Sequence, residues 1–118
     1  MTSLTTFYLS GITGKEVFDA DGEAIGRIRD LLISNAFSGT GDSNQQRVIG
    51  IRLKVRKDIR YYSFDTFRVV KAREMISVTC SGLIELSEET VNNGLLLVEN
   101  MLDRQIVDLN GRKLVRVN

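Results

Sequence analysis

A strict alternation of apolar and polar residues between positions 48 and 55 constrains the fold of this chain more than any other feature. Successive side chains of an extended strand point to opposite faces, so a two-residue period predicts a strand with one buried and one solvated face. We therefore expect a half-buried strand here. Its apolar face carries Ile49, Ile51, Leu53 and Val55, and its other face carries Gly50, Arg52, Lys54 and Arg56.

A hairpin is predicted near the start of the chain. Residues 17–19 are a short β-branched and aromatic run that ends at the turn sequence Asp19-Ala20-Asp21-Gly22, and a second run follows at residues 24–33. Aspartate can accept hydrogen bonds from nearby backbone N–H groups, and glycine accepts a positive φ angle, so these residues favour a tight turn. Gly26 lies inside the second run and predicts a bulge.

Further short strands are expected at residues 61–64, 67–70 and 75–80. The stretch 35–46 is rich in Ser, Gly, Asn and Asp, has no periodicity, and predicts an exposed loop. Many short strands separated by turns, without a long helical pattern, indicate an all-β fold, and we expect a small β-barrel.

One short helix is predicted after these strands. Ser87 can cap it, Glu88 and Glu89 suit the positive end of the helix dipole, and the sequence Asn92-Asn93-Gly94 should end it.

The opening hairpin occurs twice in the sequence, because Phe7–Arg29 aligns with Leu96–Asn118. We therefore expect a barrel domain at 7–82, a connecting segment with the short helix at 83–94, and the opening hairpin of a second repeat at 95–118. We also expect the chain to be the N-terminal part of a longer protein. The turn residues Asp19, Asp21 and Gly22 match Asp108, Asn110 and Gly111.

The chain lacks the residues of the common catalytic and metal sites. It has no histidine and one cysteine, which excludes a Ser/His/Asp triad, a Cys/His zinc site and an intrachain disulfide. Cys80 alternates with Ile76 and Val78, so we expect a buried structural thiol. Asp19-x-Asp21-Gly22 lacks the other ligands of a calcium loop. We predict no enzymatic activity, no cofactor and no metal.

Charge is distributed unevenly along a nearly neutral chain. Residues 47–73 contain nine Lys or Arg against two Asp, whereas residues 80–110 contain six Asp or Glu against one Arg. The basic stretch predicts either a docking surface, for an acidic partner or for the acidic segment of another copy of the chain, or an ordinary solvated strand face. The candidate partner surface consists of Arg52, Lys54, Arg56 and Lys57.

Aromatic residues close to the basic stretch leave RNA open as an alternative partner. Aromatic rings can stack on unpaired bases, but at strand spacing two or more of these rings are expected in the core. The four residues are Tyr61, Tyr62, Phe64 and Phe67.

The apolar run Leu95-Leu96-Leu97-Val98 has two interpretations. It packs in this chain's own core, or it is covered by a second chain, which would make these residues a self-association surface and the protein a homodimer. The N-terminus has no signal-peptide pattern, and no apolar run approaches the roughly 20 residues that cross a bilayer. We expect a cytoplasmic protein, or the soluble part of a membrane-associated one, without direct membrane insertion.

The stretch from Leu9 to Asp30 resembles the opening of a PRC-barrel domain. The family pattern is an apolar residue, Gly-Lys, Val, Asp-x-Asp-Gly, a small or apolar residue, Gly, a basic residue and Asp. This chain carries Gly14-Lys15 and Asp19-x-Asp21-Gly22 in that order. The resemblance covers residues 9–80, and residues 96–118 resemble a second start.

Residues 102–118 resemble the PRC-barrel region of bacterial proteins that also carry CBS domains or the intracellular domain of magnesium transporters. PRC-barrels in the photosynthetic reaction centre H subunit and in a ribosome-maturation factor act as docking modules. The resemblance therefore implies a non-catalytic interaction or scaffold module, linked to magnesium transport or CBS-type sensing. The alternative that it implies is an RNA- or ribosome-associated assembly factor.

Overall fold

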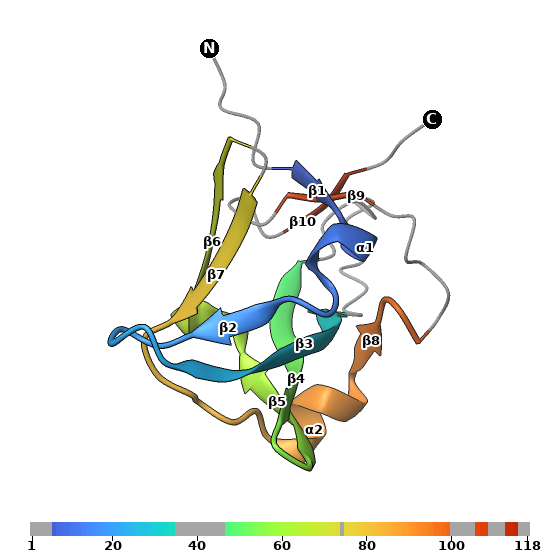
Figure 1. Ribbon diagram of the computed structural model, residues 1–118. Coiled ribbons are helices and arrows are strands. Elements are labelled where there is room, and N and C mark those ends of the chain that lie inside the picture. The colour runs from blue at the N-terminus through green and yellow to red at the C-terminus, as the bar shows by residue number, and fades with distance from the viewer. Residues whose placement is uncertain (1–5, 35–46, 74, 100–105, 109–112, 116–118) are drawn as a thin grey trace.

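A computed structural model of the protein describes residues 6–34, 47–73, 75–99, 106–108 and 113–115 (Figure 1). Within these ranges the fold is built of strands with three short helices. The strands are β1 (Thr6–Tyr8), β2 (Glu16–Phe18), β3 (Ala24–Ser34), β4 (Val48–Val55), β5 (Asp58–Ser63), β6 (Phe67–Ala72), β7 (Met75–Cys80), β8 (Gly94–Leu96), β9 (Ile106–Asp108) and β10 (Lys113–Val115). The helices are α1 (Leu9–Ile12), the 3-10 helix η1 (Phe64–Thr66) and α2 (Glu88–Asn92).

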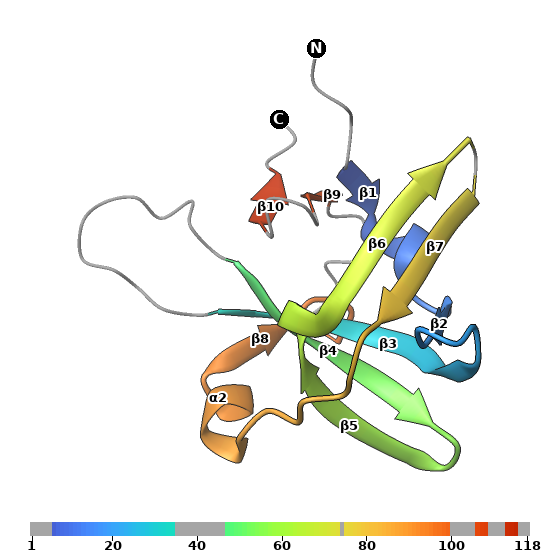
Figure 2. The same ribbon diagram turned by 90° about the vertical axis from the view of Figure 1, so that its left-hand side faces the viewer.

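The main sheet has seven strands and forms a small barrel-like fold. Its order is β5-β4-β3-β2-β7-β6, and β8 pairs with β3 beyond the end of β2. The pairing of β2 with β7 is parallel and the other pairings are antiparallel. Figure 2 shows that β6 and β7 form a long hairpin that projects away from β3, β4 and β5. The expected all-β barrel-like fold is confirmed.

The outer edge of β5 is covered by the segment that leads to α2. Ser63 N donates to Ile84 O at 2.7 Å, and Leu86 N donates to Tyr61 O at 2.9 Å. These bonds satisfy backbone groups that an exposed edge strand would leave unpaired. The segment then enters α2, where the Ser87 side chain accepts a hydrogen bond from Thr90 N and caps the helix.

The turn between β2 and β3 has the hydrogen bonds that its sequence favours. Asp19 Oδ1 accepts from the N–H groups of Asp21 and Glu23, both at 2.9 Å. Gly22 has a φ of 82°, in the left-handed region that glycine adopts without steric cost. The register of β2 against β3 shifts beside Gly26, where a bulge was predicted.

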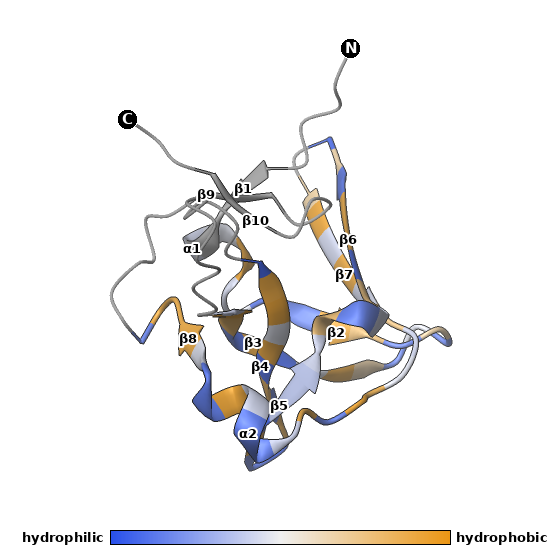
Figure 3. Cartoon of the chain, turned by 180° about the vertical axis from the view of Figure 1, so that it is seen from behind, coloured by the Kyte–Doolittle hydropathy of each residue, from blue (hydrophilic) through white to orange (hydrophobic). Residues whose placement is uncertain are grey.

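The alternation predicted for β4 is correct over its second half and wrong at Gly50. Ile51 and Leu53 are buried and Lys54 is exposed, in line with the two-residue period; in Figure 3, orange and blue bands alternate along this strand. Gly50 was predicted on the solvated face but is buried. A Cβ atom built there would lie 2.5 Å from Leu86 Cδ1, so the approach to α2 covers this part of the face.

The core contains residues of β2 to β7, of α1 and of the chain after β8. Tyr62, Phe64 and Phe67 are buried in it, which confirms that at least two of the four aromatic residues belong to the core. Cys80 is also buried, and its Sγ donates to Gly82 O at 3.1 Å. Ile12 of α1 is fully buried, although no helix was predicted there.

A second, three-stranded sheet joins the two ends of the chain in the order β1-β9-β10. β9 and β10 pair antiparallel in the region where the opening hairpin of a second repeat was predicted, and Asp108 pairs with both Thr6 and Lys113. That this region begins a second repeat stays a prediction. Asn110 and Gly111 of its predicted turn, and the predicted loop 35–46, lie outside the described residues. The division at 82/83 and 94/95 stays a prediction, and two strand pairings cross it: β1 with β9 and β3 with β8.

Candidate interaction surface

A groove on the outer face of β2, β3 and β4 brings four Lys or Arg side chains together. It has a volume of about 630 Å³. Its charged lining consists of Glu16, Arg27, Arg29, Lys54 and Arg56, and we term it the basic groove. Antiparallel pairing builds it, because Arg27 of β3 is the register partner of Lys54 of β4.

Three of the four cations in the basic groove are free to meet a ligand. Arg27 donates to Glu16 Oε1 at 3.3 Å and to Gly14 O at 3.1 Å, so its charge is balanced within the barrel. The other three make no ion pair or hydrogen bond with any residue that the structure describes. They are Arg29, Lys54 and Arg56, and all three are exposed.

Apolar and small side chains complete the lining of the basic groove. They are Ala24, Ile25, Gly26, Val55 and Leu83. Leu83, from the segment after β7, is 40% exposed. The groove therefore combines hydrocarbon surface with a charged rim.

Lys54, Arg56 and Lys57 of the predicted partner surface are exposed, and two of them line the basic groove. The prediction did not include Arg29, which lies beside them on β3. The alternation of Arg27 and Arg29 with apolar residues indicates that both lie on the solvated face of their strand. Only the register of β3 against β4 shows that this face also carries Lys54.

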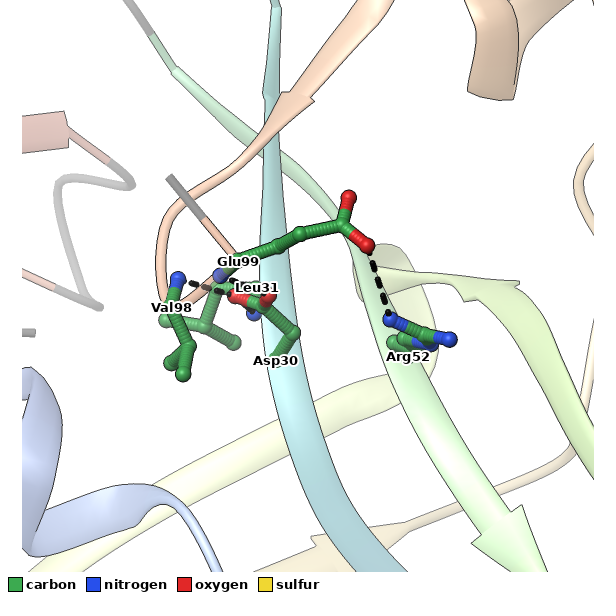
Figure 4. A network of polar contacts seen from close by, with 5 residues as sticks. All are labelled: Asp30, Leu31, Arg52, Val98 and Glu99. Atoms are coloured by element: carbon green, nitrogen blue, oxygen red, sulfur yellow. Dashed lines mark hydrogen bonds and ion pairs between the residues drawn. The ribbon is translucent and has the colours of Figure 1, made fainter. Parts of the chain in front are cut away.

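Arg52, the fourth predicted surface residue, is held by contacts within the chain. Its guanidinium lies 3.8 Å from Glu99 Oε1 (Figure 4). It also lies 5.7 Å from the centre of the Tyr61 ring, and the Arg52 side chain is 29% exposed. A cation above an aromatic ring is attracted by the negative face of the ring. Arg52 thus helps to hold the segment after β8 and does not line the groove.

Asp30 is a buried anchor that the sequence analysis did not identify. It is 1% exposed, and its carboxylate accepts three backbone hydrogen bonds, from Leu31 N (2.8 Å), Val98 N (2.7 Å) and Glu99 N (2.9 Å) (Figure 4). A buried carboxylate is tolerated when its oxygens are satisfied in this way. Asp30 therefore fixes the chain after β8 to β3.

The structure covers the segment predicted for self-association within the chain itself. Leu96 is 8% exposed and Leu97 is fully buried, Leu95 and Val98 pack against the core, and β8 pairs with β3. Of the two interpretations of this run, burial in the chain's own core is the one that agrees with these contacts. Self-association itself stays a prediction.

A second hollow, of about 530 Å³, lies beside the first, among α1, β2 and β7. Its lining includes Phe18 and Met75, which are 37% and 72% exposed. The Arg27–Glu16 pair borders both hollows. Phe18 is the one exposed aromatic side chain among the residues whose burial the structure describes.

Two kinds of site are missing from the part of the chain that the structure describes. It holds no group of three or more His, Cys, Asp or Glu side chains that could bind a metal ion. None of its helices is long and apolar enough to cross a membrane. The arrangement that does exist is a charged groove without a nucleophile and base in contact.

Comparison with known proteins gave one match. A family model described as PRC-barrel domain matches residues 4–76, which is more than half of the chain and spans β1 to the start of β7. This range includes the charged residues of the basic groove. No curated protein and no solved structure matched.

Proposed function

Because this chain belongs to the PRC-barrel domain family, whose domains are generally non-enzymatic modules, we propose that it is a non-catalytic interaction module that binds a macromolecular partner through the basic groove. The observation that carries the proposal is the set of three unpaired cations on β3, on β4 and directly after β4. These three charges do not stabilise the fold, because they lie on the solvated face and make no ion pair with a neighbouring helix or strand among the described residues.

The partner that this surface favours is a protein with an acidic segment. Charges that line a groove steer an oppositely charged ligand toward it and fix its orientation. Arg29, Lys54 and Arg56 offer such charges without first breaking an ion pair among the described residues. A scaffold role follows, in which the barrel holds its partner and leaves the chemistry to other proteins.

RNA is the second candidate, and exposed Phe18 supports it. Phosphate groups bind arginine and lysine, and an exposed aromatic ring can stack on a base. Phe18 lies at the neighbouring hollow and is 37% exposed. A ribosome-associated assembly role would use both. Phe18→Ala should then lower the affinity for a single-stranded RNA, and unchanged RNA affinity would count against this candidate.

The resemblance of residues 102–118 to regions next to CBS or magnesium-transporter domains supports a finer proposal. The module would act in a larger cytoplasmic protein that senses or transports magnesium. Reading the gene past the codon for Asn118 tests it. We expect an open frame that continues into CBS-like or transporter-like segments, and a stop codon would overturn the proposal.

The groove itself is tested by charge reversal with a matched control. Fluorescence anisotropy would follow labelled poly-glutamate binding to the full chain at low salt. Lys54→Glu with Arg56→Glu should weaken binding about tenfold or more, since it reverses two groove charges. The control Arg68→Glu with Lys71→Glu makes the same charge change on exposed positions of β6 and should change binding by about twofold at most. Equal losses would mean that total charge, and not the groove, binds the probe.

A further inference from the structure

We propose that the basic groove binds an extended acidic peptide segment that carries one aliphatic anchor residue between its carboxylates. This inference rests on the proposed function and adds the chemical class of the partner. It is carried by the mixed lining of the groove, in which the apolar side chains lie among the free cations.

The apolar part of the lining provides the anchor position. Ile25 and Val55 come from the paired strands, and Leu83 comes from the segment after β7, so the hydrocarbon surface is built from three places in the sequence. Leu83 is 40% exposed in the free protein, and covering it would remove apolar surface from water. A purely electrostatic ligand would leave that surface exposed.

Gly26 lines the groove at a close approach of two strands. A Cβ atom at Gly26 would lie 2.7 Å from Lys54 O, so β3 and β4 meet without a side chain between them. Gly26 adds no side chain to the lining, so its neighbours Ile25, Val55 and Leu83 form the apolar wall of the groove, with Lys54 beside them. An aliphatic side chain of a partner can lie against this wall while its neighbouring carboxylates reach the cations.

The same lining argues for a protein segment over RNA or a membrane surface. Base recognition uses aromatic platforms, and no aromatic side chain lines the basic groove in the described part of the chain. Tyr61 lies under the Arg52 guanidinium, and Tyr62 is buried. Phe18 borders the other hollow. A lipid surface is flat, whereas the cations and Leu83 surround a hollow.

The test compares two peptides on the full chain by fluorescence anisotropy. One is a labelled Gly-Glu-Glu-Leu-Glu-Glu-Gly peptide, and the other has Ala in place of Leu. We expect the Leu peptide to bind about fivefold more tightly, as expected for partial burial of its additional methyl and methylene groups. Leu83→Ser should remove most of this preference. Ile84→Ser, at a neighbouring position that is 56% exposed and does not line the groove, should keep it.

The outcomes separate this inference from the proposed function. If both peptides bind equally and Lys54→Glu weakens both, the groove is a docking surface but the anchor is wrong. If neither peptide binds while a labelled 20-nucleotide RNA or phosphatidylserine vesicles bind in a Lys54-dependent way, the partner class is wrong. If nothing binds in a Lys54-dependent way, the proposed function fails together with this inference.

Discussion

Asp30 Oδ1 accepts a hydrogen bond from the backbone N–H of Val98 at 2.7 Å, across 68 positions of sequence (Figure 4). The same carboxylate also binds the N–H groups of Leu31 and Glu99. Three donors that would otherwise be buried or partly buried without a partner are satisfied by one side chain. The chain after β8 is thereby held against β3. Leu97, which lies between the end of β8 and Val98, is fully buried in the core.

Asp30→Ala should therefore destabilise the protein strongly. It leaves three backbone donors without an acceptor, and we expect a loss of about 3 kcal/mol in the free energy of unfolding, measured by urea denaturation. Asp21→Ala, at an exposed turn position, is the control and should change stability by about 0.5 kcal/mol or less. If both variants unfold at the same urea concentration, the Asp30 hydrogen bonds are not important for stability.

Gly22→Ala should cost about 1 kcal/mol, because an alanine at a φ of 82° is strained even in open space. Gly82 offers the matched control: it has equally open surroundings, but its φ is outside the left-handed region. Gly82→Ala should be neutral or slightly stabilising. Thermal unfolding of the two variants compares them directly, and a Gly22→Ala protein as stable as Gly82→Ala would show that the turn changes conformation without cost.

Gly26→Ala should be more damaging than Gly22→Ala, for a different reason. Its Cβ would lie 2.7 Å from a backbone oxygen, that of Lys54, so β3 and β4 must move apart. We expect a loss of about 2–3 kcal/mol by urea denaturation. The control is Gly11→Ala in α1, where the nearest atom, Ile76 Cδ1, is 3.9 Å away, and where alanine favours a helix. A mild effect at Gly26 would mean that the strands separate easily.

Arg52→Gln and Lys54→Gln should differ in how they affect binding of poly-glutamate. Lys54 is exposed in the basic groove, so its neutral variant should weaken binding about threefold. Arg52 lies outside the lining and already pairs with Glu99, so Arg52→Gln should change binding by less than about 1.5-fold. A larger loss of affinity for Arg52→Gln would mean that Arg52 belongs to the partner surface after all.

Features that depend on local sequence could be predicted. The turn at Asp19 and Gly22 and the Ser87 cap follow from residues only a few positions apart. The two-residue period of β4 likewise shows which face of the strand is buried wherever nothing packs on its other face. These features need no knowledge of the rest of the fold.

Features that depend on long-range packing could not be predicted. Asp30 resembles any other aspartate until the segment at Val98 is placed beside it. Gly50 breaks the alternation because Leu86, far along the chain, packs over it. Arg29 joins the candidate site through the register of β3 against β4. In each case a distant segment changes the surroundings of a residue, and the local sequence contains no signal for that.

Leu97→Ala tests whether the apolar run after β8 acts within one chain. Leu97 is fully buried against the core of its own chain, so truncation should cost about 3 kcal/mol in the free energy of unfolding. The urea midpoint should not depend on protein concentration, because the lost contacts are intramolecular. Leu83→Ala makes the same substitution at a position that is 40% exposed and should cost about 1 kcal/mol or less.

The test of a dimer combines the urea midpoint, measured at several protein concentrations, with the mass of the wild-type and Leu97→Ala proteins by light scattering. If the run stabilised a dimer, unfolding of the wild-type protein would shift to higher urea as its concentration rises, and Leu97→Ala would abolish the shift. A concentration-independent midpoint, together with an unchanged mass for the variant, is the result that the burial of Leu97 predicts. Any dimer of this protein must then use another surface, and the edges of β1, β6 and β10 are the places to examine, since none of them pairs with a further strand among the described residues.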